Sequence, residues 1–135
     1  MNNEIRWQER FENFKKAYKN FSDIAVMDVG RLSDLEKEGF VQRFEYTYDL
    51  AWKTLKDYLL AQGFDLNSPR EVFRQAFQNE IITDGEVWME SISKRNLVSH
   101  TYNAEVLNKT VDFLVNDFFP VLEKMHRRLE KELGR

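Results

Sequence analysis

Residues 4–26 read EIRWQERFENFKKAYKNFSDIAV, and their large apolar side chains recur every three or four positions. This apolar series consists of Trp7, Phe11, Phe14, Tyr18, Phe21 and Ala25. Such spacing places every member on one face of an α-helix, so the stretch predicts an amphipathic helix of about six turns. A helix with one long apolar face must pack that face against other elements.

The next part of the chain indicates two further helices. Ser33 or Asp34 is suited to cap a second helix, which Gly63 ends. The pair Ser68-Pro69 opens a shorter third helix that ends near Ile82. The apolar positions of these helices that we expect in the core are Val41, Phe44, Tyr48, Ala51, Leu55, Tyr58, Leu59, Val72, Phe73, Ala76 and Phe77.

Two more helices complete the pattern. The fourth begins near Glu86 and runs into His100. Asn103 caps the last helix, and Pro120 bends it because proline lacks an amide donor and clashes with the preceding turn. Their expected core positions are Trp88, Ile92, Val106, Leu107, Val111, Leu114, Phe118, Leu122, Met125 and Leu129. The sequence therefore predicts an all-α fold, an antiparallel up-and-down helical bundle of four to five helices.

Composition limits the class of protein further. With 135 residues we expect one domain over residues 1–135. The absence of Cys excludes disulfide scaffolds and thiol nucleophiles and favours a reducing cytosol. We find no signal-peptide pattern and no apolar run near the ~20 residues that span a bilayer, so we expect a cytoplasmic protein. The net charge of −3 supplies no overall positive field, so any RNA contact must depend on a local cluster.

One dense polar cluster, KRNLVSHTYN, occupies residues 94–103. Its polar groups include Arg95, Asn96, Ser99, His100 and Tyr102. These residue types suit metal-free cleavage of a phosphodiester, in which an imidazole moves protons near neutral pH and a guanidinium binds the phosphate. Amide and hydroxyl groups would orient the two. For RNA, the 2′-hydroxyl of the substrate could serve as the nucleophile.

The same cluster admits a structural interpretation. Arg95 and His100 near a helix C-terminus can complement the helix dipole and cap its free carbonyl groups. On a straight helix the two side chains lie about 140° apart, so bringing them together requires a helix end, a bend or a second subunit. The spacing alone favours this structural interpretation over the catalytic one.

Other charged groups favour surface roles. The basic stretch His126-Arg127-Arg128 is followed by interleaved glutamates, and it fits a solvated helix face better than an RNA contact. Glu45 and Asp49 have the helical spacing of surface ion pairs with the lysines at positions 53 and 56. The paired carboxylates of the chain have no matching Glu-x-x-His motif, so we expect no metal site.

Several stretches, in the same order along the chain, resemble a known family. They are FEYTYDLAWK at residues 44–53, RQAF at 74–77, the segment around Trp88 and RNLVSHTY at 95–102. Over about residues 35–130, the sequence resembles the nucleotidyltransferase substrate-binding-protein family of the HEPN superfamily. This ordered match is much more specific than the short motif, and it favours the catalytic interpretation over a dipole-complementing one.

The resemblance implies a helical bundle that forms a homodimer or higher homo-oligomer and pairs with a minimal nucleotidyltransferase. In related HEPN toxins, Arg-x4-His motifs of two subunits meet at a dimer cleft and cleave RNA without a metal. On this chain Arg95 would bind the phosphate, His100 would act as general acid or base, and Asn96 would orient the substrate. We also expect Ser99 among the substrate-binding groups. In toxin–antitoxin relatives the partner transfers AMP from ATP to a Tyr that corresponds to Tyr102, so this chain itself needs no cofactor.

Two functions of different classes follow from the resemblance. The leading expectation is a HEPN ribonuclease, the toxin of a toxin–antitoxin pair, which the nucleotidyltransferase silences. The alternative is a non-catalytic subunit that binds a substrate or nucleotide for a two-component nucleotidyltransferase. A purely structural helical adaptor is a third interpretation.

Overall fold

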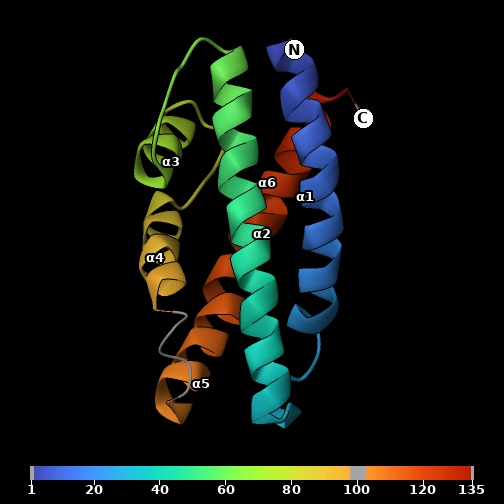
Figure 1. Cartoon of the computed structure of the whole chain (residues 1–135), viewed down its shortest axis with the longest axis vertical. Coiled ribbons are helices and arrows are strands. Elements are labelled where there is room, and N and C mark those ends of the chain that lie inside the picture. The colour runs from blue at the N-terminus through green and yellow to red at the C-terminus, as the bar shows by residue number, and fades with distance from the viewer. Residues whose placement is uncertain (1, 98–102, 135) are drawn as a thin grey trace.

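A computed structural model describes residues 2–97 and 103–134, which are helical apart from short turns (Figure 1). Two long helices, α1 (Asn3–Ala25) and α2 (Asp34–Ala61), lie antiparallel and side by side. A 3-10 turn, η1 (Val29–Arg31), joins them. The expected all-α fold is confirmed over the described residues.

The remaining helices cover the other sides of α2. The short helices α3 (Pro69–Gln78) and α4 (Gly85–Asn96) pack beside it, and α4 runs back along its length (Figure 1). The last segment comprises α5 (Ala104–Phe113), a π-helical turn η3 (Leu114–Phe118) and α6 (Phe119–Glu132). It returns the chain to the end of the bundle at which α1 begins. Taken as one continuous helix, this segment completes the predicted up-and-down bundle.

Aromatic rings form the centre of the core. The ring of Phe118 on η3 meets Phe21 of α1, Phe44 of α2 and Trp88 of α4 edge-on, with centroids 5.8, 5.0 and 5.5 Å apart. Edge-to-face contacts of this kind add to the free energy gained by burying the rings. One side chain of η3 therefore holds three other helices together.

The predicted core positions are buried, with four exceptions. Tyr18, Ile92 and Val106 are partly exposed, and Phe77 is 52% exposed. The expectation that Phe77 belongs to the core is therefore wrong. Phe77 is the next-to-last residue of the ten-residue helix α3. Its ring lies against Gly85, where a Cβ atom added to the glycine would be 3.2 Å from the ring.

Two helix ends differ from the prediction. The third helix ends at Gln78 instead of near Ile82, because Glu80 adopts a left-handed backbone conformation with φ 60°. The amide of Ile81 then donates to the carbonyl of Ala76 at 2.9 Å and closes the helix end. The fourth helix ends at Asn96, so the expected helical continuation stops before the segment 98–102, which lies outside the described residues.

The last helix is irregular just before Pro120, the residue at which the sequence predicts a bend. The turn before it widens into the π-helical η3, and α6 then begins with Pro120 in its first turn. A π turn lengthens the hydrogen-bond spacing, which accommodates a residue that has no amide donor and whose ring clashes with the carbonyl four residues earlier. Phe118, within this π turn, is buried in the core.

The predicted caps are present. Ser33 forms a capping box with Glu36, and Asn103 accepts hydrogen bonds from the amides of Glu105 and Val106 at 2.9 and 3.3 Å. Gly63 has φ 100°, a conformation that glycine adopts without strain. In the described part of the chain, no helix has the length and apolar character needed to cross a membrane.

Candidate functional site

Arg95 lies in the last turn of α4 and reaches across to α2. Its Nε atom is 3.6 Å from Oδ1 of Asp49, and its Nη2 atom is 3.8 Å from Oε2 of Glu45. The side chain of Arg95 is 33% exposed, so part of the guanidinium remains open to solvent. The residue expected to bind phosphate therefore sits at the surface between two carboxylates.

The sequence of α2 explains this arrangement. Glu45 and Asp49 are one helical turn apart, which places them on the same face of the helix. Phe44 and Tyr48, which precede them, are buried in the core and fix the rotation of the helix. The expectation that the two carboxylates pair with lysines on their own helix is wrong, because their ion pairs cross to α4.

The guanidinium is paired by charge more than by hydrogen bonds. The Nε atom of Arg95 is buried and donates no hydrogen bond within the described residues. Both carboxylate contacts are longer than a hydrogen bond of ordinary length. With two carboxylates beside one guanidinium, this group carries one net negative charge.

Tyr48 lies behind this ion-pair group. Burial and, to a smaller extent, the charge of Asp49 raise the pKa of its phenol to about 12, and the charge of Arg95 opposes the shift. The phenol therefore stays protonated at neutral pH, and we exclude it as a general base.

The other predicted site residues divide into two groups. Asn96 follows Arg95 at the end of α4 and is exposed, so both residues lie at the same end of that helix. Ser99, His100 and Tyr102 lie outside the described residues. The structure therefore places Arg95 and Asn96 together and leaves the positions of the other three as predictions.

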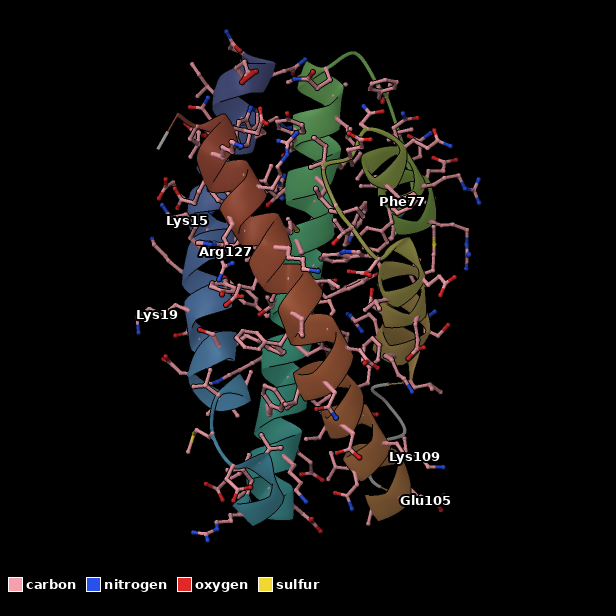
Figure 2. The ribbon with its side chains drawn as sticks, turned by 180° about the vertical axis from the view of Figure 1, so that it is seen from behind. Lys15, Lys19, Phe77, Glu105, Lys109 and Arg127 are labelled. Atoms are coloured by element: carbon pink, nitrogen blue, oxygen red, sulfur yellow. The ribbon has the colours of Figure 1, made fainter. Side chains whose placement is uncertain are left out.

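A hollow of about 380 Å³ opens beside the last turn of α4. It is lined by Glu90, Lys94, Lys109, Asp112, Phe113, Asn116 and Asp117. Within it the ammonium of Lys94 lies over the ring of Phe113, 5.6 Å from the centroid. Lys109, at the start of the last segment in Figure 2, pairs with Glu105 at 3.0 Å. The mixed charge of this hollow favours no single class of ligand.

A larger hollow of about 800 Å³ lies at the opposite end of α4. Phe73 and Phe77 of α3 line it together with residues from the first turn of α4, and Figure 2 shows Phe77 on the outer side of α3. Arg95 is not among its lining residues. Its size therefore gives no reason to place the phosphodiester chemistry there.

The second histidine of the chain is packed against α1. The ring of His126 stacks on Tyr18 with centroids 4.5 Å apart and planes 13° apart. Burial lowers its pKa below the usual value, although the carboxylates of Glu130 and Glu123 oppose this shift. The neighbouring Arg127 pairs with Glu123 at 3.0 Å and faces outward in Figure 2. Arg127 thus lies on a solvated helix face, as expected for this stretch, whereas His126 is packed against α1 instead of solvated.

Within the residues that the structure describes, no group of three or more acidic or histidine side chains could hold a metal ion. Two carboxylates converge at Arg95, but the guanidinium already occupies the space between them.

Comparison with known proteins places the chain in a family. The family model described as nucleotidyltransferase substrate binding protein like matches residues 9–131. This match covers most of the chain, including α2, α4 and the Arg95 segment. The chain belongs to this family.

Individual relatives agree in fold. The chain is 29% identical, in an alignment of 99 residues, to a Haemophilus influenzae protein named probable ribonuclease HepT. The match covers 67% of this chain and 67% of that protein. The crystal structure of a Thermus thermophilus protein matches with a TM-score of 0.78 at 28% identity, covering 86% of this chain and 98% of that one. A Haemophilus influenzae structure, described as the fold of a substrate binding domain of a nucleotidyltransferase, matches with a TM-score of 0.74. At 19% identity, over 89% of this chain and 98% of that one, the latter likeness concerns the fold alone.

Proposed function

We propose that this chain is a metal-independent endoribonuclease of the HEPN type, the toxin of a pair whose antitoxin is a minimal nucleotidyltransferase. The observation that carries the proposal is the position of Arg95, which is partly exposed at the end of α4, one residue before Asn96 and five before His100. The name of the Haemophilus influenzae relative, probable ribonuclease HepT, supports the same activity.

The proposed reaction needs no group beyond this motif and the RNA. His100, as general base, takes the proton of the 2′-hydroxyl, and the 2′-oxygen attacks the adjacent phosphorus. The bond from phosphorus to the 5′-oxygen breaks, and the imidazolium of His100 returns its proton to that oxygen as general acid. Arg95 neutralises charge on the phosphate, while Asn96 and Ser99 orient it. The products are a 2′,3′-cyclic phosphate and a 5′-hydroxyl.

Silencing is assigned to the partner. The nucleotidyltransferase would use ATP to place AMP on Tyr102, the phenolic oxygen attacking the α-phosphate and pyrophosphate leaving. A bulky anion two residues from His100 would block an RNA phosphate sterically and by like charge. This step requires no nucleotide bound to the present chain.

The test is to induce the wild-type chain alone and the His100→Ala variant, and to follow growth and total RNA. We expect growth arrest and new RNA ends with the wild type only. Both should be relieved when the partner nucleotidyltransferase is expressed as well. His126→Gln, which removes the other imidazole far from Arg95 in the chain, is the matched control and should remain toxic. If His100→Ala arrests growth as strongly as the wild type, the catalytic assignment is wrong.

A second function is favoured by the description of the family itself, substrate binding for a nucleotidyltransferase. In that case Arg95 and His100 would be binding groups in a non-catalytic subunit. Expression of the chain alone would be harmless, and a mixture of chain and transferase would show a transfer activity that neither has alone. Normal growth and intact RNA in every culture, at equal amounts of folded protein, would favour this alternative.

A further inference from the structure

The two carboxylates beside Arg95 face different atoms of its guanidinium. Asp49 faces Nε, which is buried, whereas Glu45 faces Nη2 at the end of the side chain. We propose that Asp49 is a positioning residue that orients Arg95 toward a phosphodiester, and that Glu45 competes with the phosphate for the same guanidinium. This proposal rests on the proposed function and names two residues that the Arg-x4-His motif does not contain.

Asp49 can orient Arg95 because of the geometry of the guanidinium. Nε is the atom nearest the aliphatic stem, so a carboxylate beside it limits rotation of the whole planar group. The Nε atom has almost no contact with solvent and donates no hydrogen bond within the described residues, so the carboxylate of Asp49 is the charge that faces it. A side chain held in advance loses less conformational entropy when it binds a phosphate. Asp49 thus directs the exposed end of Arg95 outward.

Glu45 competes with a phosphate through its negative charge. Nη2 belongs to the end of the guanidinium that a phosphate would reach, and the carboxylate of Glu45 stands 3.8 Å from it. A phosphate approaching Arg95 meets two carboxylates and one guanidinium, a group with a net charge of −1. The side chains of Arg95 and Glu45 are about a third exposed and that of Asp49 is 41% exposed, so solvent weakens this repulsion without removing it. Removing the charge of Glu45 should therefore strengthen phosphate binding.

The first experiment measures kcat and KM for cleavage of a short single-stranded RNA. We expect Asp49→Asn to lower kcat about tenfold or more, because Arg95 loses its fixed orientation, and Asp49→Glu to restore part of that loss. We expect Glu45→Gln to lower KM several-fold with kcat unchanged. Glu38→Gln removes the same charge about 10 Å further along α2 and should change neither constant. An unchanged kcat in Asp49→Asn, with the fold intact by circular dichroism, would overturn the positioning role.

The second experiment does not require RNA cleavage. In nuclear magnetic resonance spectra, the Nε–Hε signal of Arg95, assigned by its loss in Arg95→Lys, should report an ordered group in the wild type and a mobile one in Asp49→Asn. Equal order in both proteins would contradict the positioning role even if the chain cleaves no RNA. If the wild type does not cleave RNA but Asp49→Asn mobilises Arg95, the ribonuclease proposal fails and the positioning role stands.

Competition by Glu45 is tested with a DNA oligonucleotide, which carries phosphodiesters but lacks the 2′-hydroxyl and cannot be cleaved by the proposed reaction. We expect Glu45→Gln to bind it several-fold more tightly than the wild type does, and Arg95→Ala to abolish the gain. Equal affinity of Glu45→Gln and wild type, or no binding by either, would overturn the competition.

Discussion

At the scale of single residues, one buried carboxylate joins the two longest helices. Asp57 of α2 is 4% exposed and accepts a hydrogen bond from Nε of Arg10 at 2.6 Å, while Nε of Arg6 lies 3.6 Å from its other oxygen. Removing this charge would leave a partly buried guanidinium of α1 without its counter-charge. The contact therefore determines how α1 and α2 are aligned.

We expect Asp57→Asn to lower the free energy of unfolding by about 2–3 kcal/mol, measured by urea denaturation. Asp23→Asn is the matched control, because Asp23 is 55% exposed and its contact with Lys19 at 3.5 Å is a surface pair. The control should cost less than about 0.5 kcal/mol. Equal losses for the two variants would show that the Asp57 contact contributes no more than a surface pair.

Because His126 is packed against α1, we expect the stability of the protein to depend on pH. Burial lowers the folded-state pKa of His126, so the unfolded chain binds a proton more readily there than the folded chain does. Its contribution to stability is therefore fully present above the unfolded-state pKa of about 6.5 and is lost as the pH falls toward the lower folded-state value. Relative to His126→Gln, we expect the wild type to lose stability as the pH falls from about 7 to about 5. Parallel pH profiles of the two proteins would contradict this.

Glu45, Asp49 and Phe77 show where residue-level prediction from the sequence fails. The spacing of the two carboxylates on α2 fits ion pairs with lysines of the same helix as well as it fits the observed pairs with Arg95 of α4. A helical period does not indicate which neighbouring helix packs alongside. The only available signal was their place in the stretch 44–53, which carries part of the family resemblance. Phe77 continues the apolar face of α3, but it lies one residue before the end of that helix and is 52% exposed.

At the scale of elements, the helix starts follow from local chemistry. Ser33 accepts a hydrogen bond from the amide of Glu36 at 3.1 Å, and the Glu36 carboxylate accepts one from the amide of Ser33 at 2.9 Å. The backbone N–H of Ser33 and, to a smaller extent, its hydroxyl lower the pKa of the Glu36 carboxyl. We expect Ser33→Ala to lower the free energy of unfolding by about 1 kcal/mol. It should raise the pKa of Glu36 only part of the way toward its usual value, because the backbone N–H of residue 33 remains. If the substitution changed neither the stability nor the titration of Glu36, the Ser33 hydroxyl would take no part in the cap in solution.

Helix ends and the π turn are less predictable than helix starts. Caps such as Ser33 and Asn103 are read from two or three neighbouring residues, and both are confirmed. The end of α3 depends on the left-handed backbone of Glu80, a conformation that a glutamate seldom adopts and that tertiary packing must impose. Likewise Pro120 indicates a disturbance of the helix, but not that the disturbance takes the form of a π turn carrying the buried Phe118.

At the scale of the whole molecule, the dimer cleft that the family resemblance implies would depend on two copies of the chain. If the functional site combines Arg95 of one subunit with His100 of the other, a heterodimer of Arg95→Ala and His100→Ala retains one site with an intact Arg and an intact His. We expect the doubly tagged heterodimer to cleave RNA while both parent homodimers are inactive. An inactive heterodimer that folds and dimerises normally would place both groups of each active site in one subunit or exclude the cleft.

The ribonuclease proposal itself is decided by incubating the purified chain with single-stranded RNA in the presence of EDTA. We expect cleavage by the wild type that leaves 2′,3′-cyclic phosphate ends, and none by Arg95→Ala or His100→Ala at equal thermal stability. Intact RNA with the wild type, equal cleavage by all three proteins, or cleavage abolished by EDTA would contradict the proposal.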